Sequence, residues 1–309
     1  MFELSIDWSW VNPEAFSIGS LSIRWYGILY ACAFIASYYA FKELLKFDKV
    51  PKDFADRALI FMILGTLIGA RVGDCFFYNH EYYLKNPWEI LYTWKGGLSS
   101  HGGAIGILTA LFIFGRKTKK PYIWILDRVV IVIGVAGFFI RMGNLMNSEI
   151  YGHATDMPWG FKFNKDDFAS HPTMIYEGLY YALTYFVLRF VYRKLENRPK
   201  PFLIFGLFLM MVFVFRFCIE FIKNDQNSEL EKVLLETIGL NMGQTLSVPF
   251  VILGIIMLIY SIHQQRPAPL PAEQPEIAHV HRHNKSKPVK KTVTNHQQKS
   301  GNNQKQKKK

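Results

Sequence analysis

Seven stretches of mostly apolar residues alternate with polar segments along the first 263 residues of the chain. They cover residues 22–41, 58–77, 98–114, 122–141, 173–192, 202–222 and 243–262. A transmembrane α-helix needs about 20 predominantly apolar residues, and each stretch is close to that length. The pattern therefore predicts an all-α, polytopic membrane protein with seven transmembrane helices.

Basic residues in the connecting segments indicate how these helices are oriented. The segments 42–57, 115–121 and 193–201 carry five, four and four Lys or Arg residues, and all three would lie on the same side. Cytoplasmic loops of membrane proteins are enriched in Lys and Arg. We therefore expect the N-terminus to lie outside the cell and the C-terminus inside.

Composition changes after residue 263. Residues 264–309 hold eleven Lys or Arg and two Glu residues, so they carry +9 of the net charge of +12. Segments of this composition bury too little apolar surface to fold. We expect a membrane domain over residues 1–263 and a disordered, basic cytoplasmic tail over residues 264–309. The tail could also contact anionic lipids or the ribosome, or bind a metal ion through its histidines.

Polar residues inside the apolar stretches fall at a similar depth once the orientation is set. The outer parts of the helices hold Arg24, Tyr26, Arg71, Asp74, His101, Arg141, His171, Tyr176, Glu177, Arg216 and Glu220. Ionisable residues within a membrane are costly, and by default they suggest a functional site. We therefore expect one site near the outer side of the membrane.

Several of these residues could instead have only structural roles. Arg216 and Glu220 are four positions apart on a predicted helix and could neutralise each other. Arg71 and Asp74 are three positions apart and could do the same. These pairs would then stabilise the helices without binding a substrate.

The amides and rings of the site also have two interpretations. Asn144 and Asn147 could only cap the end of the fourth helix, and Tyr26 could belong to the aromatic belt at the membrane surface. A single histidine such as His101 is usually a hydrogen-bonded structural residue. Here glycines flank it, and glycines let a ligand approach closely, which favours a chemical role.

Arg141 and Arg216 come from different predicted helices at the same depth. Guanidinium groups match the geometry of phosphate oxygens, and a phospholipid headgroup is the nearest such anion. His101 could act as a general base there. The three cysteines lie in apolar stretches without zinc-type spacing, so no metal site is expected. The residues alone thus predict an outward-facing site for a phosphate ester.

Six motifs follow one another along residues 18–262. They occupy residues 24–27, 69–71, 94–103, 141–149, 171–177 and 216–221. In types and order they resemble the motifs of the prolipoprotein diacylglyceryl transferases. The central motif, 141–149, is similar to the family's arginine-glycine-asparagine signature, with Leu145 where an aromatic residue is usual and Ser148 where glycine is common.

The resemblance implies a transferase in the bacterial cytoplasmic (inner) membrane. Its substrates would be phosphatidylglycerol and prolipoprotein signal peptides with a lipobox cysteine, which meet among the membrane lipids. The diacylglyceryl group would pass to the cysteine thiol, forming a thioether and releasing glycerol phosphate. The resemblance implies no cofactor, no metal ion and no nucleic acid.

We expect three catalytic residues. His101 would be the general base, and Arg141 and Arg216 would stabilise the departing phosphate. Substrate-binding or orienting roles fall to Tyr26, Arg71, Asn144, Asn147, Glu149, Tyr176, Glu177 and Glu220. If His101 is not the base, the base is expected among the three glutamates of this set.

Two other classes of protein could also carry polar residues of this kind inside the membrane. A secondary transporter or channel for an anionic solute would also need arginines inside the membrane, but the sequence lacks the internal repeats such folds often show. An intramembrane serine protease could use Ser99 or Ser100 with His101, yet neither serine lies in a Gly-x-Ser-x-Gly motif. The transferase is therefore the favoured interpretation.

Overall fold

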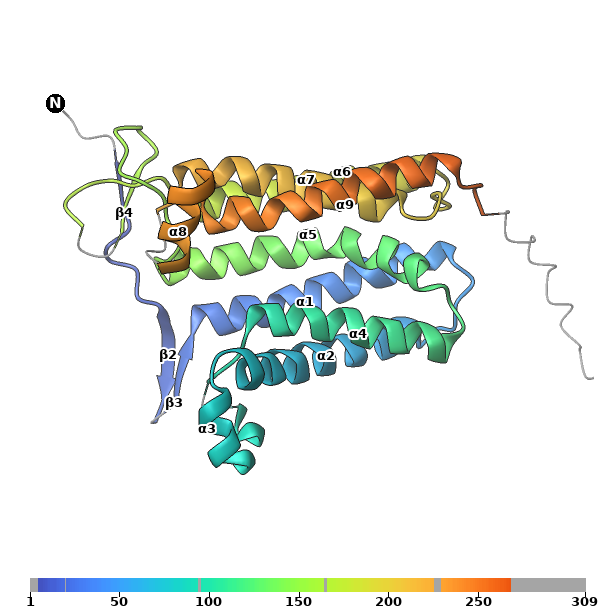
Figure 1. Cartoon of the computed structure of the whole chain (residues 1–309), viewed down its shortest axis with the longest axis horizontal. Helices are drawn as coiled ribbons and strands as arrows, with labels where there is room; N and C mark the ends of the chain where they lie inside the picture. Colours follow the sequence, from blue (N-terminus) through green and yellow to red (C-terminus); the bar gives the residue numbers. More distant parts are fainter. Residues whose placement is uncertain (1–4, 20, 94–95, 164–165, 225–228, 268–309) are drawn as a thin grey trace, which may run out of the picture. The chain divides into compact units, whose positions relative to one another are not determined.

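Helices make up most of the structure, a computed structural model that describes residues 5–19, 21–93, 96–163, 166–224 and 229–267. The long helices are α1 (Trp25–Leu44), α2 (Phe54–Phe77), α4 (Ser100–Thr118), α5 (Tyr122–Met146), α6 (Thr173–Lys194), α7 (Leu203–Ile219) and α9 (Met242–His263) (Figure 1). Each overlaps one of the apolar stretches. The expectation of a mainly helical membrane protein is confirmed.

Short elements lie between the long helices. They are α3 (His80–Lys85), α8 (Glu229–Ile238) and the 3-10 turns η1 (Leu45–Phe47), η2 (Pro87–Leu91) and η4 (Glu220–Ile222). Strands β2 (Glu14–Ile18) and β3 (Leu21–Arg24) form an antiparallel pair, and β1 (Ile6–Asp7) pairs in parallel with β4 (Phe161–Lys162). The fold is thus not purely α-helical. Because residues 21–24 are extended in β3, α1 begins at Trp25 rather than at residue 22.

Five of the helices in the described part of the chain are long and apolar enough to cross a membrane. These candidate spans are Trp25–Phe47, Phe54–Phe77, Tyr122–Met146, Leu203–Ile222 and Met242–His263. The helices α4 and α6 lie where the other two spans were predicted, but they are more polar. α4 ends in basic residues, and α6 carries charged residues and several tyrosines. Of the predicted tail, only residues 264–267 lie among the described residues.

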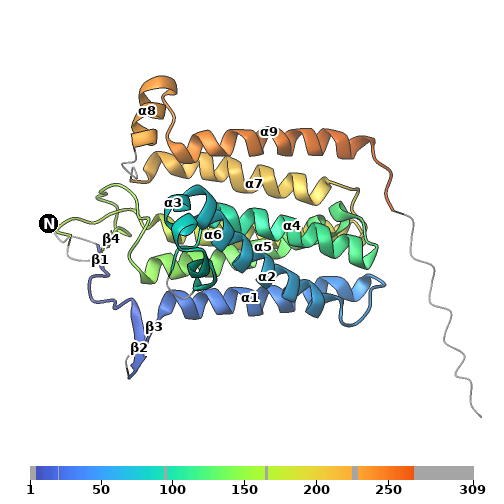
Figure 2. The same cartoon turned by 60° about the horizontal axis from the view of Figure 1, so that its bottom comes forward.

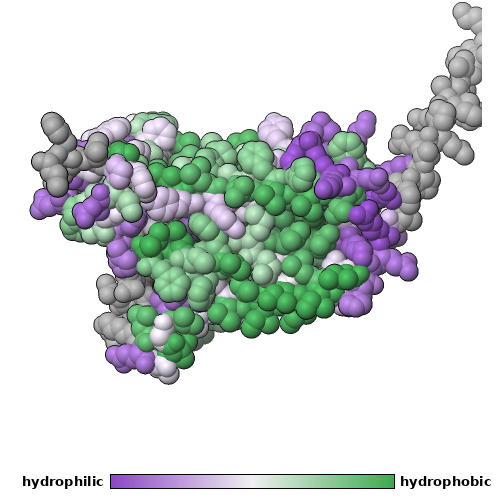
Figure 3. Space-filling view, turned by 90° about the horizontal axis from the view of Figure 1, so that it is seen from above, coloured by the Kyte–Doolittle hydropathy of each residue, from purple (hydrophilic) through white to green (hydrophobic). Residues whose placement is uncertain are grey.

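The surface agrees with a membrane protein. Figure 3 shows an apolar band over the helices with hydrophilic residues at both ends of it. Many large hydrophobic side chains are exposed on α2, α4 and α9, such as Ile68, Ile105 and Ile256 at 59%, 57% and 56%. Side chains of this kind are stable at a surface that faces lipid rather than water.

Glycines allow α2 and α4 to pack backbone against backbone. Gly69 and Gly73 on α2 face Gly102 and Gly106 on α4, so closely that side chains would not fit between them. Small residues at such positions let helices approach each other in membranes. A similar contact joins α7 and α9, which lie side by side in both cartoon views (Figures 1 and 2).

Buried charges join the helices at the end where α5 begins. Arg128 donates to both carboxylate oxygens of Asp48, over 2.9 and 2.7 Å, and Tyr192 donates to Asp48 over 3.2 Å. Asp127 accepts the backbone N–H groups of Phe202 and Phe205 at the start of α7. These contacts fix the starts of α5 and α7 and the loop after α1.

Replacing Gly106 with alanine is expected to destabilise the protein. A Cβ atom there would overlap the Gly65 carbonyl oxygen and lie 2.7 Å from the Gly69 Cα atom, so α2 and α4 would have to move apart. Overpacking of this kind costs about 1–3 kcal/mol. Thermal unfolding in detergent should therefore show a lower midpoint than the wild type.

Gly27→Ala is the matched control. No heavy atom lies within 4 Å of a Cβ placed at Gly27, so its unfolding midpoint should stay at or above that of the wild type. Equal midpoints for both variants would contradict close packing of α2 against α4.

Candidate active site

Arg141 lies on α5, five residues before the helix ends at Met146. The helix therefore continues past Arg141, which was predicted to close it. The Nε atom of Arg141 lies 3.1 Å from Glu177 Oε2 in an ion pair, and Nη1 donates to Asn144 Oδ1 over 3.1 Å. Among the described residues, none bonds to Nη2. Two guanidinium nitrogens of Arg141, Nε and Nη1, are thus engaged, while Nη2 makes no bond to a described residue.

The chain folds back after α5 and brings Glu149 to the amides of the helix end. Ser148 and Ile150 have positive φ angles of 51° and 63°, and this left-handed backbone produces the turn. Glu149 Oε1 accepts from Asn144 Nδ2 at 2.7 Å and from Asn147 Nδ2 at 3.4 Å. The carboxylate therefore orients Asn144, which in turn orients Arg141.

Tyr26 reaches the same place from the first turn of α1. A Cβ atom at Gly143 would lie 2.8 Å from Cδ2 of the Tyr26 ring, so the ring rests on the backbone of α5. Gly143 follows Arg141 by two positions on the same helix. The Tyr26 ring therefore lies beside the turn of α5 that carries Arg141, although Tyr26 comes from α1.

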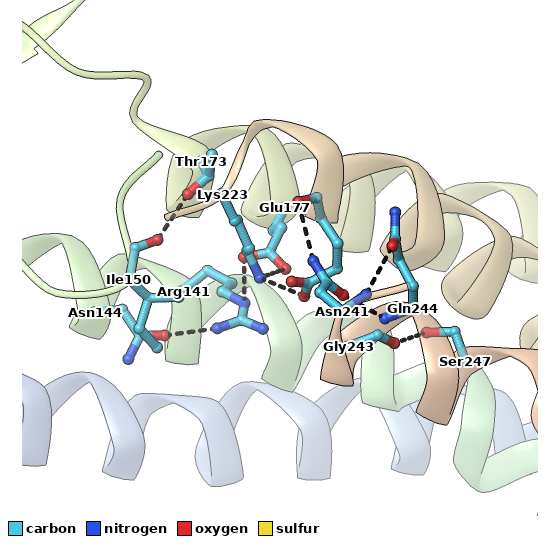
Figure 4. A network of polar contacts seen from close by, with 11 residues as sticks. Arg141, Asn144, Ile150, Thr173, Glu177, Lys223, Asn241, Gly243, Gln244 and Ser247 are labelled. Carbon is cyan, nitrogen blue, oxygen red and sulfur yellow. Dashed lines mark hydrogen bonds and ion pairs between the residues drawn. The ribbon is translucent and has the colours of Figure 1, made fainter. Parts of the chain in front are cut away.

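Glu177 stands between two cations, as Figure 4 shows. Its Oε2 atom pairs with Arg141, and its Oε1 atom accepts from Lys223 Nζ over 2.8 Å. Lys223 also lies 3.3 Å from Glu220 Oε1. The side chains of Glu177, Lys223 and Glu220 are only 5%, 8% and 11% exposed. The contacts join α5, α6 and the turn after α7 in one buried network.

Lys223 is a residue of this network that the sequence motifs did not indicate. A signal was present, because Lys223 follows Glu220 by three positions in a region that otherwise holds few basic residues. Its contact with Glu177 on α6 depends on the tertiary fold and has no counterpart in the local sequence.

Arg216 lies in the last turn of α7. Its Nε atom is buried without a hydrogen-bond partner, and no ion pair to it is found in the described part of the chain. Glu220, one turn further on, bonds to Lys223 instead. The alternative that Arg216 and Glu220 neutralise each other is therefore not the arrangement seen.

The start of α9 closes the site beside Glu220. Asn241 caps this helix, since its side chain accepts from Gln244 N over 2.8 Å, and its Nδ2 donates to the Glu220 carbonyl over 3.3 Å. A Cβ atom at Gly243 would lie 2.5 Å from Glu220 Oε1. The carboxylate thus lies against the N-terminal turn of α9, where the helix dipole stabilises negative charge.

Tyr176 belongs to a neighbouring cluster. Trp159 Nε1 donates to the Tyr176 hydroxyl over 2.9 Å, and that hydroxyl lies 3.3 Å from His171 Nδ1. Within the described ranges, no hydrogen bond connects this cluster to Arg141. Tyr176 therefore adjoins the network only through its neighbour Glu177 in the sequence.

Arg71 is fully engaged with backbone carbonyl groups. Its five N–H donors meet the carbonyl oxygens of Glu89, Ile90, Tyr92, Gly96 and Gly97. The guanidinium also lies over the Tyr83 ring, 4.8 Å from its centroid. No donor is left for a substrate in this conformation, which favours a structural role for Arg71 over the predicted binding role.

His101 is exposed near the start of α4, where Ser99 caps the helix by accepting from Gly102 N over 3.2 Å. It makes no hydrogen bond with any described residue, so no contact ties it to the Arg141 network. The start of α4, which carries His101, lies at the same end of the helices as the ends of α5 and α7 (Figure 1). The described residues include no group of three His, Cys, Asp or Glu side chains that could hold a metal ion.

These features define a multi-pass membrane protein with a network of arginine, lysine and glutamate side chains at one end of its helices. A family model described as prolipoprotein diacylglyceryl transferase matches residues 13–260. The chain belongs to this family, as the six motifs indicated.

Several relatives are similar over most of the chain. The phosphatidylglycerol–prolipoprotein diacylglyceryl transferases of Chloroherpeton thalassium and Porphyromonas gingivalis are each 39% identical to it. The two alignments cover 82% and 83% of this chain and 94% and 95% of the relatives. That of Vibrio cholerae is 34% identical, over 81% of this chain and 92% of the relative. None of these comparisons supports a transporter or channel.

Proposed function

We propose that this protein transfers the diacylglyceryl group of phosphatidylglycerol to the lipobox cysteine of an exported prolipoprotein. The family and the names of the relatives support this activity. The structural observation that carries the proposal is that Arg141 and Arg216 keep N–H donors that no described residue engages. A guanidinium with free donors is suited to a phosphate group.

The reaction requires a nucleophile and a stabilised leaving group. The thiol sulfur attacks the glycerol carbon that bears the phosphate, and a carbon–sulfur bond forms as the carbon–oxygen bond breaks. The bonding electron pair stays on the phosphate oxygen, and glycerol phosphate departs. Negative charge therefore grows on the phosphate, where donors fixed in advance lower the barrier.

Arg141 and Arg216 would supply those donors. Glu177 and Asn144 would keep the Arg141 guanidinium in place, since each contacts one of its nitrogens. Glu149 would act one step further away by orienting Asn144 and Asn147. Tyr26, packed on Gly143 beside Arg141, is in position to contact the glycerol headgroup.

His101 is proposed as the general base. A cysteine thiol has an unperturbed pKa of about 8.5, so it is mostly protonated at neutral pH and reacts faster when a base removes the proton. His101 is exposed near the start of α4, whereas Gly102 beside it packs against Gly69 and Gly73 of α2. His101 could therefore meet a thiol brought by a signal peptide from the surrounding lipid.

We also propose that α4 and α6 complete a set of seven spans in the bacterial cytoplasmic (inner) membrane. The N-terminus would be outside and the tail, residues 264–309, inside, with no role for nucleic acid. The positively charged segments 115–121 and 193–201 support this orientation.

Reporter fusions after Lys120 and Lys200 should both read cytoplasmic, and a periplasmic signal at either would contradict this orientation.

The activity itself can be tested with the purified protein, phosphatidylglycerol labelled in its acyl chains and a peptide that contains a lipobox cysteine. A thioether-linked diacylglyceryl peptide and free glycerol phosphate should appear together. Release of glycerol phosphate without labelled peptide would show hydrolysis instead of transfer and would contradict the proposal.

His101→Gln is expected to reduce the transfer rate while phosphatidylglycerol still binds. General base catalysis typically contributes about a hundred- to ten-thousand-fold in rate, so the maximal rate should fall within that range and the KM for lipid should change little. His80→Gln, an exposed histidine on α3, is the control. A near-normal rate for His101→Gln would move the base to Glu149, Glu177 or Glu220.

Arg141→Lys is expected to fail although it keeps the positive charge. One ammonium group cannot contact Glu177 and Asn144 and also present a further donor to a phosphate, as the planar guanidinium does. We expect transfer to fall about a hundredfold or more. Arg57→Lys, in an ion pair whose partners are 46% and 60% exposed, should keep wild-type activity. Activity retained by Arg141→Lys would show that charge alone is enough.

A further inference from the structure

Lys223 is buried at a place where lysine is uncommon. It follows the turn η4, and its backbone is bound to the loop after α5 through a bridge to Gly152 and the bond from His153 N to the Ile222 carbonyl. The side chain is 8% exposed. Lysine is almost never fully buried unless it is paired, and here the partners are the carboxylates of Glu177 and Glu220.

The cations and carboxylates of the network are not paired one to one. Glu177 contacts both Arg141 and Lys223, whereas Glu220 contacts Lys223, and Arg216 has no carboxylate partner among the described residues. Yet Glu220 follows Arg216 by four positions, the spacing at which oppositely charged side chains pair along a helix. A nearer competing cation must therefore account for the position of the Glu220 carboxylate.

Lys223 is that cation. Its Nζ atom lies 3.3 Å from Glu220 Oε1, and on the other side Gly243 leaves just enough room for the same carboxylate against the start of α9. The Nε atom of Arg216 is meanwhile buried and unbonded. A buried donor without a hydrogen-bond partner is unfavourable. We therefore expect a ligand to accept the hydrogen bond of Arg216 Nε.

We infer that Lys223 is a positioning residue that holds Glu220 away from Arg216 and so keeps the Arg216 guanidinium available for the phosphate of the lipid donor. The inference rests on the proposed function and assigns part of its lipid affinity to a residue that does not itself contact the lipid. Without Lys223, the Glu220 carboxylate turns to Arg216 and competes with the phosphate.

Lys223→Met tests this, because methionine keeps a long side chain but lacks the charge. The KM for phosphatidylglycerol in mixed micelles should rise about tenfold or more, the effect of losing a close charge contact. In the double variant Lys223→Met with Glu220→Gln, the KM should fall back to that of Glu220→Gln alone, since the competing carboxylate is gone. Lys223→Arg should stay close to the wild type.

Lys85→Met is the matched control, because it removes an exposed lysine from α3 at the same end of the helices. Its KM should not change. Thermal unfolding of every variant separates loss of structure from loss of lipid affinity. If Lys223 had only a structural role, adding Glu220→Gln would not reverse the effect of Lys223→Met on the KM.

Three results would contradict the inference. One is a folded Lys223→Met protein with the KM of the wild type, and another is a folded double variant whose KM stays as high as that of Lys223→Met. If Lys223→Met does not fold, the double variant is compared with Glu220→Gln alone. A KM of the folded double variant well above that of Glu220→Gln is then the third result. Failure of the wild-type protein to form a thioether would instead contradict the proposed function.

Discussion

The carboxylate of Glu177 is the contact on which the end of the helices that holds the site depends. It is shared by Arg141 at 3.1 Å and Lys223 at 2.8 Å and is only 5% exposed. Because two largely buried cations use one carboxylate, its removal would leave both without full compensation, and breaking a buried pair in this way costs about 3–5 kcal/mol. Glu177 therefore holds α5, α6 and the turn after α7 in register around the site.

Four arginines of the long helices fall into two groups according to how many of their N–H donors are bonded. Arg128 is satisfied by Asp48 and by the Trp124 carbonyl, and Arg71 uses its donors on five carbonyl oxygens. In Arg141 and Arg216, by contrast, donors remain that no described residue takes up. Saturated arginines fix the chain, whereas arginines with spare donors are prepared for an anion. Glu220 pairs with Lys223, and Glu149 accepts from two asparagine amides, so neither carboxylate occupies those donors.

Much of the fold could be predicted from the sequence, because hydropathy alone locates long apolar helices and loop charge suggests their orientation. The location of Arg141 and the amides after it was also evident, although α5 runs on to Met146. The engagement of Arg71 could not be foreseen, since it depends on backbone carbonyl groups of residues 89–92 and 96–97. Lys223 was missed for the same reason: its pairing with Glu177 arises only when α6 and the end of α7 pack together.

The phosphate of the lipid donor is proposed to bind the spare donors of Arg141 and Arg216. A structure of the protein with phosphatidylglycerol bound would test this proposal. We expect phosphate oxygens within hydrogen-bond distance of Arg216 Nε and Arg141 Nη2, with Lys223 still between Glu177 and Glu220. A phosphate bound elsewhere, with Arg216 paired to Glu220, would contradict it.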